Sequence, residues 1–113
     1  MSSANSIHGP RKEVLGGKRF DTETADFICD VSSEGPSPTD FKFWHGGLYK
    51  TVKGAYFING SGGPLTMFRT LADGGGFGGG NGIRVLDMEQ ARSYAERTLS
   101  ADEVAQFFTV IDG

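Results

Sequence analysis

Residues 48–58, LYKTVKGAYFI, decide the fold that the sequence predicts. The stretches LYKTV (48–52) and AYFI (55–58) are rich in the aromatic and β-branched side chains that favour strands. Lys53-Gly54 lies between them and suits a compact hairpin turn. The sequence therefore predicts a β-hairpin in the middle of the chain.

Shorter strand-like segments flank this hairpin. FKFW (41–44) alternates as a strand does, the Gly46-Gly47 pair after it predicts a bulge or bend, and IRVL (83–86) predicts another short strand. NGSGGP (59–64) predicts a loop. PLTMFRTLA (64–72) fits either a strand or one short helix, and its pattern does not decide between them.

A second, smaller ribbon is predicted near the N-terminus. Gly16-Gly17 separates residues 14–15 from residues 19–20, and two adjacent glycines can take the positive φ values of a tight hairpin turn. Residues 1–12 are polar and contain a Gly-Pro pair, which predicts a disordered tail. A chain of 113 residues then fits one domain, over residues 13–113.

Residues 21–31, DTETADFICDV, predict an N-terminal helix. Asp21 is placed to cap it and Glu23 suits the positive end of its dipole. The apolar residues at helical spacing are expected to face inward: Ala25, Ile28 and Cys29. SSEGPSP (32–38) contains two prolines and a glycine, which end the helix.

The C-terminal segment predicts two consecutive short helices. Asp87 with Gln90 and Ser100 with Glu103 each have the spacing of a capping box. The expected apolar stripes are Met88, Ala91, Ala95 and Leu99, then Ala101, Val104, Ala105 and Phe108. The predicted fold class is therefore α+β: a small, hairpin-rich antiparallel sheet with one N-terminal helix and two short C-terminal helices packed on one of its faces.

A glycine-rich loop is predicted over residues 73–82. Residues 74–79 formally match G-x-G-x-x-G, but the dinucleotide motif needs a helix directly after it, and a strand-like run follows here. Ordering so many glycines costs about 1–2 kcal/mol per residue. The tract therefore predicts a flexible spacer with one aromatic anchor, Phe77, which inserts either into the core or into a partner.

Catalytic and metal-binding patterns are weak. Cys29, the single cysteine, could form a nucleophilic pair with His45, but it lies on the inward face of the predicted helix, where cysteine acts as a small apolar residue. The neighbouring carboxylates lack the spacing of a calcium loop or a zinc motif: Asp26, Asp30, Glu34 and Asp40. His8 lies in the predicted tail. We expect no catalytic, cofactor or metal site, and a protein that is not an enzyme.

Charge is distributed unevenly along the chain. The net charge is -3, which disfavours a general nucleic-acid-coating role. Residues 1–20 carry four basic side chains against one acidic, whereas residues 87–113 carry six acidic against two basic. The C-terminal acidic block suits a basic partner, although ordinary surface solubility also explains such a block.

The sequence thus nominates side chains for contact with a partner. Acidic candidates are Glu89, Glu96, Asp102 and Glu103, and aromatic candidates are Trp44, Tyr56 and Phe77. Trp44 and Tyr56 could instead be buried by helices on the sheet. The apolar runs are too short for a membrane span and the N-terminus lacks the apolar segment of a secretory signal, so we expect a cytoplasmic protein.

Three segments resemble a group of small bacterial proteins from plasmids, phages and integrated mobile elements. They are GGKRFDTETA (16–25), LYKTVKGAYFINGSGGPLT (48–66) and IRVLDMEQARSYAE (83–96), and the resemblance covers most of residues 13–108. The shared motifs are K-R-[FY]-D-T-x-T-A, LY-x-T-x-K-G-x-[FY]-F and GG-P-[LM]-[ST]. This chain departs from the group in HGG (45–47) and in its long glycine tract.

The resemblance implies a setting in which small acidic proteins occlude host defence proteins, as anti-CRISPR proteins do. The leading hypothesis is a stoichiometric inhibitor that covers the basic surface by which a CRISPR effector grips RNA or DNA. One alternative is a nucleic-acid-binding accessory protein that uses the basic ribbon, Arg11, Lys12, Lys18 and Arg19. Another is a small enzyme that uses Cys29 or His45. The oligomeric state is left open.

Overall fold

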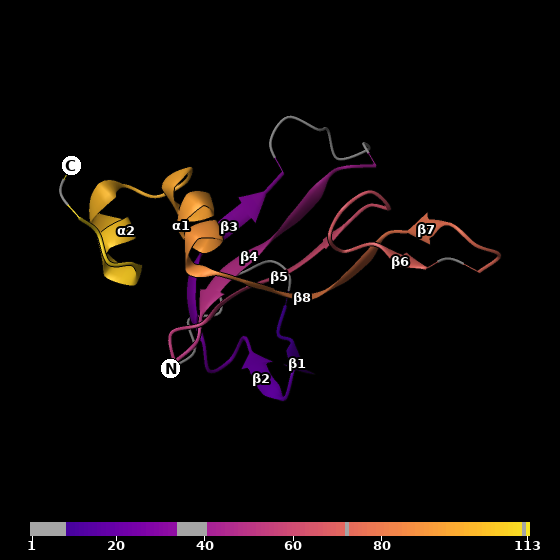
Figure 1. Ribbon diagram of the computed structural model, residues 1–113, viewed down its shortest axis with the longest axis horizontal. Coiled ribbons are helices and arrows are strands. Elements are labelled where there is room, and N and C mark those ends of the chain that lie inside the picture. The colour runs from indigo at the N-terminus through magenta and orange to yellow at the C-terminus, as the bar shows by residue number, and fades with distance from the viewer. Residues whose placement is uncertain (1–8, 34–40, 72, 112) are drawn as a thin grey trace.

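The computed structural model describes residues 9–33, 41–71, 73–111 and 113 of an α+β protein with antiparallel sheets (Figure 1). The strands are β1 (Lys12–Leu15), β2 (Lys18–Asp21), β3 (Asp26–Ser32), β4 (Trp44–Lys50), β5 (Tyr56–Gly62), β6 (Thr70–Leu71), β7 (Phe77–Gly78) and β8 (Gly80–Leu86). The helices are α1 (Met88–Glu96) and α2 (Ala101–Phe107), in the two segments that the sequence predicts.

The centre of the fold is a four-stranded antiparallel sheet in the order β3-β4-β5-β8. The β4–β5 hairpin aligns Leu48 with Ile58 and Tyr49 with Phe57, and all four side chains are fully buried. Gly54 in the turn has φ +90°, which an L-residue rarely adopts. The predicted hairpin at residues 48–58 is confirmed.

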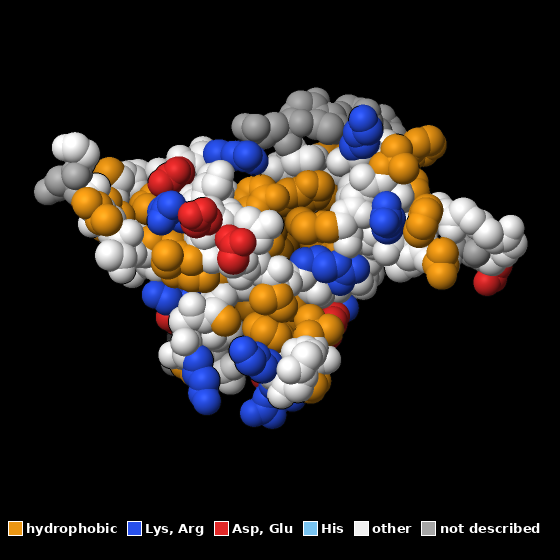
Figure 2. Space-filling model, in the orientation of Figure 1, with side chains coloured by type: hydrophobic (Ala, Val, Ile, Leu, Met, Phe, Trp, Pro, Cys, Tyr) orange, Lys and Arg blue, Asp and Glu red, His pale blue; other side chains and the backbone are white. Residues whose placement is uncertain are grey.

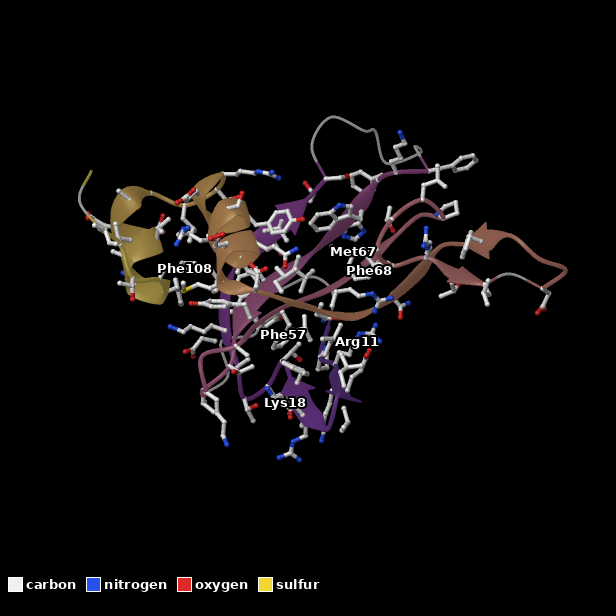
Figure 3. The ribbon with its side chains drawn as sticks, in the orientation of Figure 1. Arg11, Lys18, Phe57, Met67, Phe68 and Phe108 are labelled. Atoms are coloured by element: carbon white, nitrogen blue, oxygen red, sulfur yellow. The ribbon has the colours of Figure 1, made fainter. Side chains whose placement is uncertain are left out.

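One face of this sheet packs against α1 and α2. Ala91 and Ala95 of α1 are fully buried, and Phe108 at the end of α2 stacks on Tyr56 with ring centroids 4.8 Å apart. Phe68 fills the same layer further along the sheet (Figure 3). Short helices with small residues at the contact can approach the sheet closely, which explains the alanines at these positions.

The β1–β2 hairpin packs on the opposite face. Phe20 of β2 meets Phe57 edge to face at 5.7 Å, in a second core cluster with Tyr49 and Ile83. The turn consists of Gly16 and Gly17, both with positive φ, as predicted. Burial of both sheet faces makes β4 and β5 apolar on both sides, so their sequences show little alternation.

The predicted N-terminal helix is wrong, because its C-terminal half forms strand β3. Asp21 does accept a hydrogen bond from the Glu23 N–H (2.9 Å), but it starts only one turn. A bulge between Phe27 and Cys29 then places Ile28 and Cys29 side by side in the buried layer. The bulge breaks the period of two and imitates the spacing of a helix.

Glycines extend β4 and β5 beyond the predicted strands. Gly46-Gly47 continues β4 without the predicted break, and β5 runs through the predicted loop to Gly62. A Cβ at Gly46 would lie 2.5 Å from Ile58 Cγ2, and one at Gly62 would lie 2.5 Å from Thr66 Oγ1. Because Gly62 has no side chain, Thr66 can lie against it. Residues 63–69 therefore form a series of turns on the face of the sheet that also bears the helices.

The glycine tract forms a hairpin in place of the predicted spacer. Residues 74–76 make the turn between β6 and β7, and Gly80 to Gly82 begin β8, which pairs with β5 from Gly62 onward. Backbone hydrogen bonds to a strand already in the sheet offset part of the conformational entropy that the glycines lose when they become ordered.

The folded part of the chain begins earlier than predicted. Residues 1–8 lie outside the described residues. The Gly9 carbonyl accepts a hydrogen bond from Asn59 Nδ2 (3.0 Å), and the Arg11 N–H donates to Thr22 Oγ1 (2.8 Å). Residues 9–12 of the predicted tail therefore contact the domain, and β1 starts at Lys12.

Candidate functional site

The predicted acidic residues lie on α1 and α2, which occupy one end of the molecule (Figures 1 and 2). Both helices begin at capping boxes: Asp87 Oδ1 accepts from the Gln90 N–H (2.8 Å), and Ser100 Oγ accepts from the Glu103 N–H (3.3 Å). The caps satisfy N–H groups that the helix cannot pair and fix where each helix starts.

The four acidic candidates are all exposed: Glu89, Glu96, Asp102 and Glu103. On the inward side of the same two helices, Ala91, Ala95 and Val104 are buried. Burial of one side of each helix therefore turns the carboxylates to solvent. Residues 87–111 carry five carboxylates against the two guanidinium groups of Arg92 and Arg97, so this end of the molecule is acidic.

The carboxylates differ in what they contact. Glu96 lies 3.7 Å from Arg92 Nε, and Glu103 Oε1 accepts a hydrogen bond from the Ser100 N–H (2.9 Å). The hydrogen bonds to Ser100 lower the pKa of Glu103. Among the described residues, no hydrogen bond or ion pair holds the side chains of Glu89 and Asp102. Both lie in the first turn of their helices, where a negative charge favours the helix dipole, and their carboxylate oxygens are open to a partner.

Asp30 is exposed on β3 and lines a small surface pocket with Tyr94, Arg97 and Thr98 near the end of α1. Burial, together with the negative charges of Asp30 and Glu103, raises the pKa of the Cys29 thiol from 9.0 to about 11. Both carboxylates therefore lie close enough to act on one thiol, although they come from different elements. Asp30 was missed as a surface neighbour of the end of α1, because a predicted helix at residues 21–31 gave no reason to join them. We call Asp30, Glu89, Glu96, Asp102 and Glu103 the acidic end.

The aromatic candidates do not join the acidic end. Tyr56 is 5% exposed, and its hydroxyl donates to the Phe107 carbonyl (2.7 Å), so it holds α2 onto the sheet. Trp44 is half-buried and meets the Tyr94 ring at 5.4 Å. Phe77 is half-exposed on the β6–β7 hairpin. Two of the three aromatic candidates therefore belong to the core, and only Phe77 faces solvent substantially.

The Cys29–His45 pair is not formed. Cys29 is aligned with Leu48 of β4 and belongs to the core cluster beneath the helices. His45 is three residues from Leu48 along the strand, so it points to the opposite face, where its Nε2 lies 3.2 Å from Ser61 Oγ. The sheet separates the thiol from the imidazole.

The basic ribbon is partly engaged in holding the fold together. Arg11 Nε donates to Asn59 Oδ1 (2.8 Å), and Arg11 Nη1 lies 3.7 Å from Glu13. Glu13 in turn accepts from the Ile83 N–H of edge strand β8 (3.2 Å). The exposed cations of the ribbon are Lys12, Lys18 and Arg19. Of the predicted acidic cluster, Asp26 and Asp30 lie exposed on β3, whereas Glu34 and Asp40 are outside the described residues.

No protein-family model, curated protein or solved structure matches the chain. In the described ranges, no three His, Cys, Asp or Glu side chains are grouped to hold a metal ion. No helix in the part of the chain that the structure describes is long and apolar enough to cross a bilayer.

Proposed function

We propose that this protein is a stoichiometric inhibitor of a host defence complex, of the anti-CRISPR type, and that its acidic end covers a basic surface of a CRISPR effector. The observation that carries the proposal is the exposure of all four predicted carboxylates on two consecutive helices. Asp30 on β3 is exposed close to the end of α1. An effector that grips RNA or DNA carries the complementary basic charge.

The acidic end fits the requirements of charge-steered binding. Its helices start at defined caps and are fixed to the sheet by Val104, Phe108 and the Tyr56–Phe107 hydrogen bond, so the carboxylates keep their spacing. Complementary charge accelerates encounter and selects partners more than it adds affinity. The association rate should therefore fall as salt rises, because ions screen exposed charges over about 10 Å at 0.1 M.

The test reverses the two carboxylates that make no side-chain hydrogen bond or ion pair, in the variant Glu89→Lys/Asp102→Lys. Its matched control is Glu23→Lys/Asp26→Lys, which changes the net charge equally at exposed positions near the β2–β3 turn. Each protein is mixed with purified CRISPR effectors of several types, and binding is followed by gel filtration and by association kinetics at two salt concentrations. We expect a complex for the native chain and the control, and at least about a tenfold slower association for the reversal.

Phage plating on an immune host that expresses each variant gives the functional result. The native chain and the control should restore plating, and the reversal should not. Unimpaired inhibition by Glu89→Lys/Asp102→Lys would contradict the role of the acidic end, and failure to bind or inhibit any effector would contradict the proposed function. DNA or RNA binding at low salt that Lys18→Glu/Arg19→Glu abolishes would favour the nucleic-acid-binding alternative.

A further inference from the structure

A two-stranded arm projects from the main sheet at the end away from the helices (Figure 1). It contains β6 and β7, and we call residues 69–71 and 73–79 the β6–β7 arm. Leu71 is aligned with Phe77 across the pair, so their side chains lie on one face of the arm. Thr70 Oγ1 donates to the Gly79 carbonyl (3.0 Å) and ties the strands together near the root.

This face combines large exposed apolar groups with a cation. Leu71 is 81% exposed and Phe77 is 50% exposed. The Arg69 guanidinium lies 4.5 Å from the centre of the Phe77 ring, in cation–π contact. Figure 2 shows apolar side chains and cations together in the region where the arm leaves the sheet. Aromatic, leucine and arginine side chains presented together on a projection form a surface suited to insertion into a partner.

The root of the arm is closely packed and sets its direction. A Cβ at Gly79 would lie 2.8 Å from the Gly62 carbonyl oxygen, and one at Gly80 would lie 2.7 Å from Thr70 Cγ2. At the tip the glycines serve a different purpose: Gly74, Gly75 and Gly76 all have positive φ and open space around them. The arm is thus held at its base and turned by glycine at its tip.

We propose that the β6–β7 arm inserts Leu71 and Phe77 into an apolar groove of a partner protein, with a carboxylate at the rim of the groove paired to Arg69. A groove suits the arm because the side opposite these residues carries only the small residues Thr70 and Gly78, which let a second wall of the partner approach the backbone. The positive charge of Arg69 on the apolar face selects the acidic rim. This role does not depend on the acidic end or on the host-defence assignment.

Two other occupants fit less well. A second copy would bury only one face of each arm. The area buried by these few side chains would fall far short of the roughly 800 Å² per partner that a stable interface needs. A nucleic acid would require a basic excess, but Arg69 and Asp73 give the described arm residues no net charge. An acidic-rimmed protein groove is therefore the occupant that the arm favours.

The test selects partners from a random peptide library displayed on phage, with the full-length purified protein as bait and the variant Leu71→Ser/Phe77→Ser for counter-selection. We expect enriched peptides that combine large apolar residues with Asp or Glu. The dissociation constant of a synthetic copy should rise at least about tenfold in Leu71→Ser/Phe77→Ser. Arg69→Gln should remove the preference for acidic peptides. The control Val14→Ser/Val52→Ser, which alters two exposed apolar residues on β1 and in the β4–β5 turn, should bind normally.

Several outcomes would overturn the proposal. In the selection, these are the enrichment of no peptide that depends on Leu71 and Phe77, or the enrichment of peptides without acidic residues. A dimer that forms through the arm, detected by sedimentation, would also contradict it. So would binding of single-stranded oligonucleotides through the arm at low salt. Near-UV circular dichroism verifies that each variant remains folded. Glu89→Lys/Asp102→Lys should retain peptide binding, so failure of the proposed inhibitor function and failure of the arm proposal are distinguishable.

Discussion

Cys29 is the residue whose chemistry the fold changes most. It is 6% exposed beneath the helices, and burial together with Asp30 and Glu103 raises its pKa from 9.0 to about 11. A raised pKa means that the folded protein holds the proton more tightly than the unfolded chain does. The resulting stabilisation is complete below pH 9 and is lost as the pH rises through about 11.

We therefore expect the free energy of unfolding of the native chain and of the variant Cys29→Ala to differ between pH 8 and pH 11. Over this range it should fall by up to about 3 kcal/mol more in the native chain than in the variant. Urea unfolding at a series of pH values measures this difference, and the variant corrects for lysine and tyrosine residues that titrate in the same range. Parallel pH profiles of the two proteins would show that the thiol is not perturbed.

Single residues also explain where prediction from sequence stops. Asp21 carries a real capping signal, since it accepts from the Glu23 N–H, but nothing in the sequence says that the helix ends after one turn. Trp44 and Tyr56 look equally suited to core and interface. Their burial is decided by Tyr94 and Phe108, which reach them from helices about fifty residues further along the chain.

At the scale of elements, α2 depends on its cap. It has seven residues, too few to be stable alone, and its capping box pairs Ser100 with Glu103 in both directions. We expect Ser100→Ala to lower the free energy of unfolding by about 1 kcal/mol, measured by urea denaturation. The hydrogen bonds that lower the pKa of Glu103 should likewise be lost as the pH falls below its ordinary value of 4.5.

Ser93→Ala provides the matched control for the cap. Ser93 is exposed within α1, where alanine has the higher helix propensity, so this change should be neutral or slightly stabilising. A loss of stability equal to that of Ser100→Ala would mean that serine content, and not the cap, matters.

The capping boxes were predictable because their hydrogen bonds span three residues. Strand β3 was not predictable from the sequence, because its bulge exists only when the strand is paired with β4.

The whole molecule places its two candidate surfaces far apart, along a longest dimension of 50 Å. The helices of the acidic end contribute Ala91, Ala95 and Val104 to a core cluster, whereas none of the described arm residues belongs to one. Local opening should therefore differ across the molecule. We expect backbone amides of Leu48 and Ile58 in the central strands to exchange with deuterium at least about a hundredfold more slowly than those of Leu71 and Phe77 in the arm.

Hydrogen exchange followed by mass spectrometry or NMR measures this contrast. Equal protection of the arm and the central strands would show that the arm is part of the main cooperative unit. Addition of an arm-binding peptide should selectively slow exchange in the arm, whereas an effector bound at the acidic end should slow exchange in α1 and α2.

The sequence by itself determined the features that depend on near neighbours: the β4–β5 and β1–β2 hairpins, the two C-terminal helices with their caps, and the acidity of residues 87–111. Turns and caps need only three or four adjacent residues, so their physics is contained in the local sequence.

Only the tertiary structure decided that residues 26–32 form a strand, that the glycine tract enters β8, and that Cys29 and His45 lie on opposite faces. These features depend on which strands pair and on what covers each face. Hydrogen bonds and burial between distant residues outweigh local preference there, since a strand is stabilised by its partners and not by its own sequence alone.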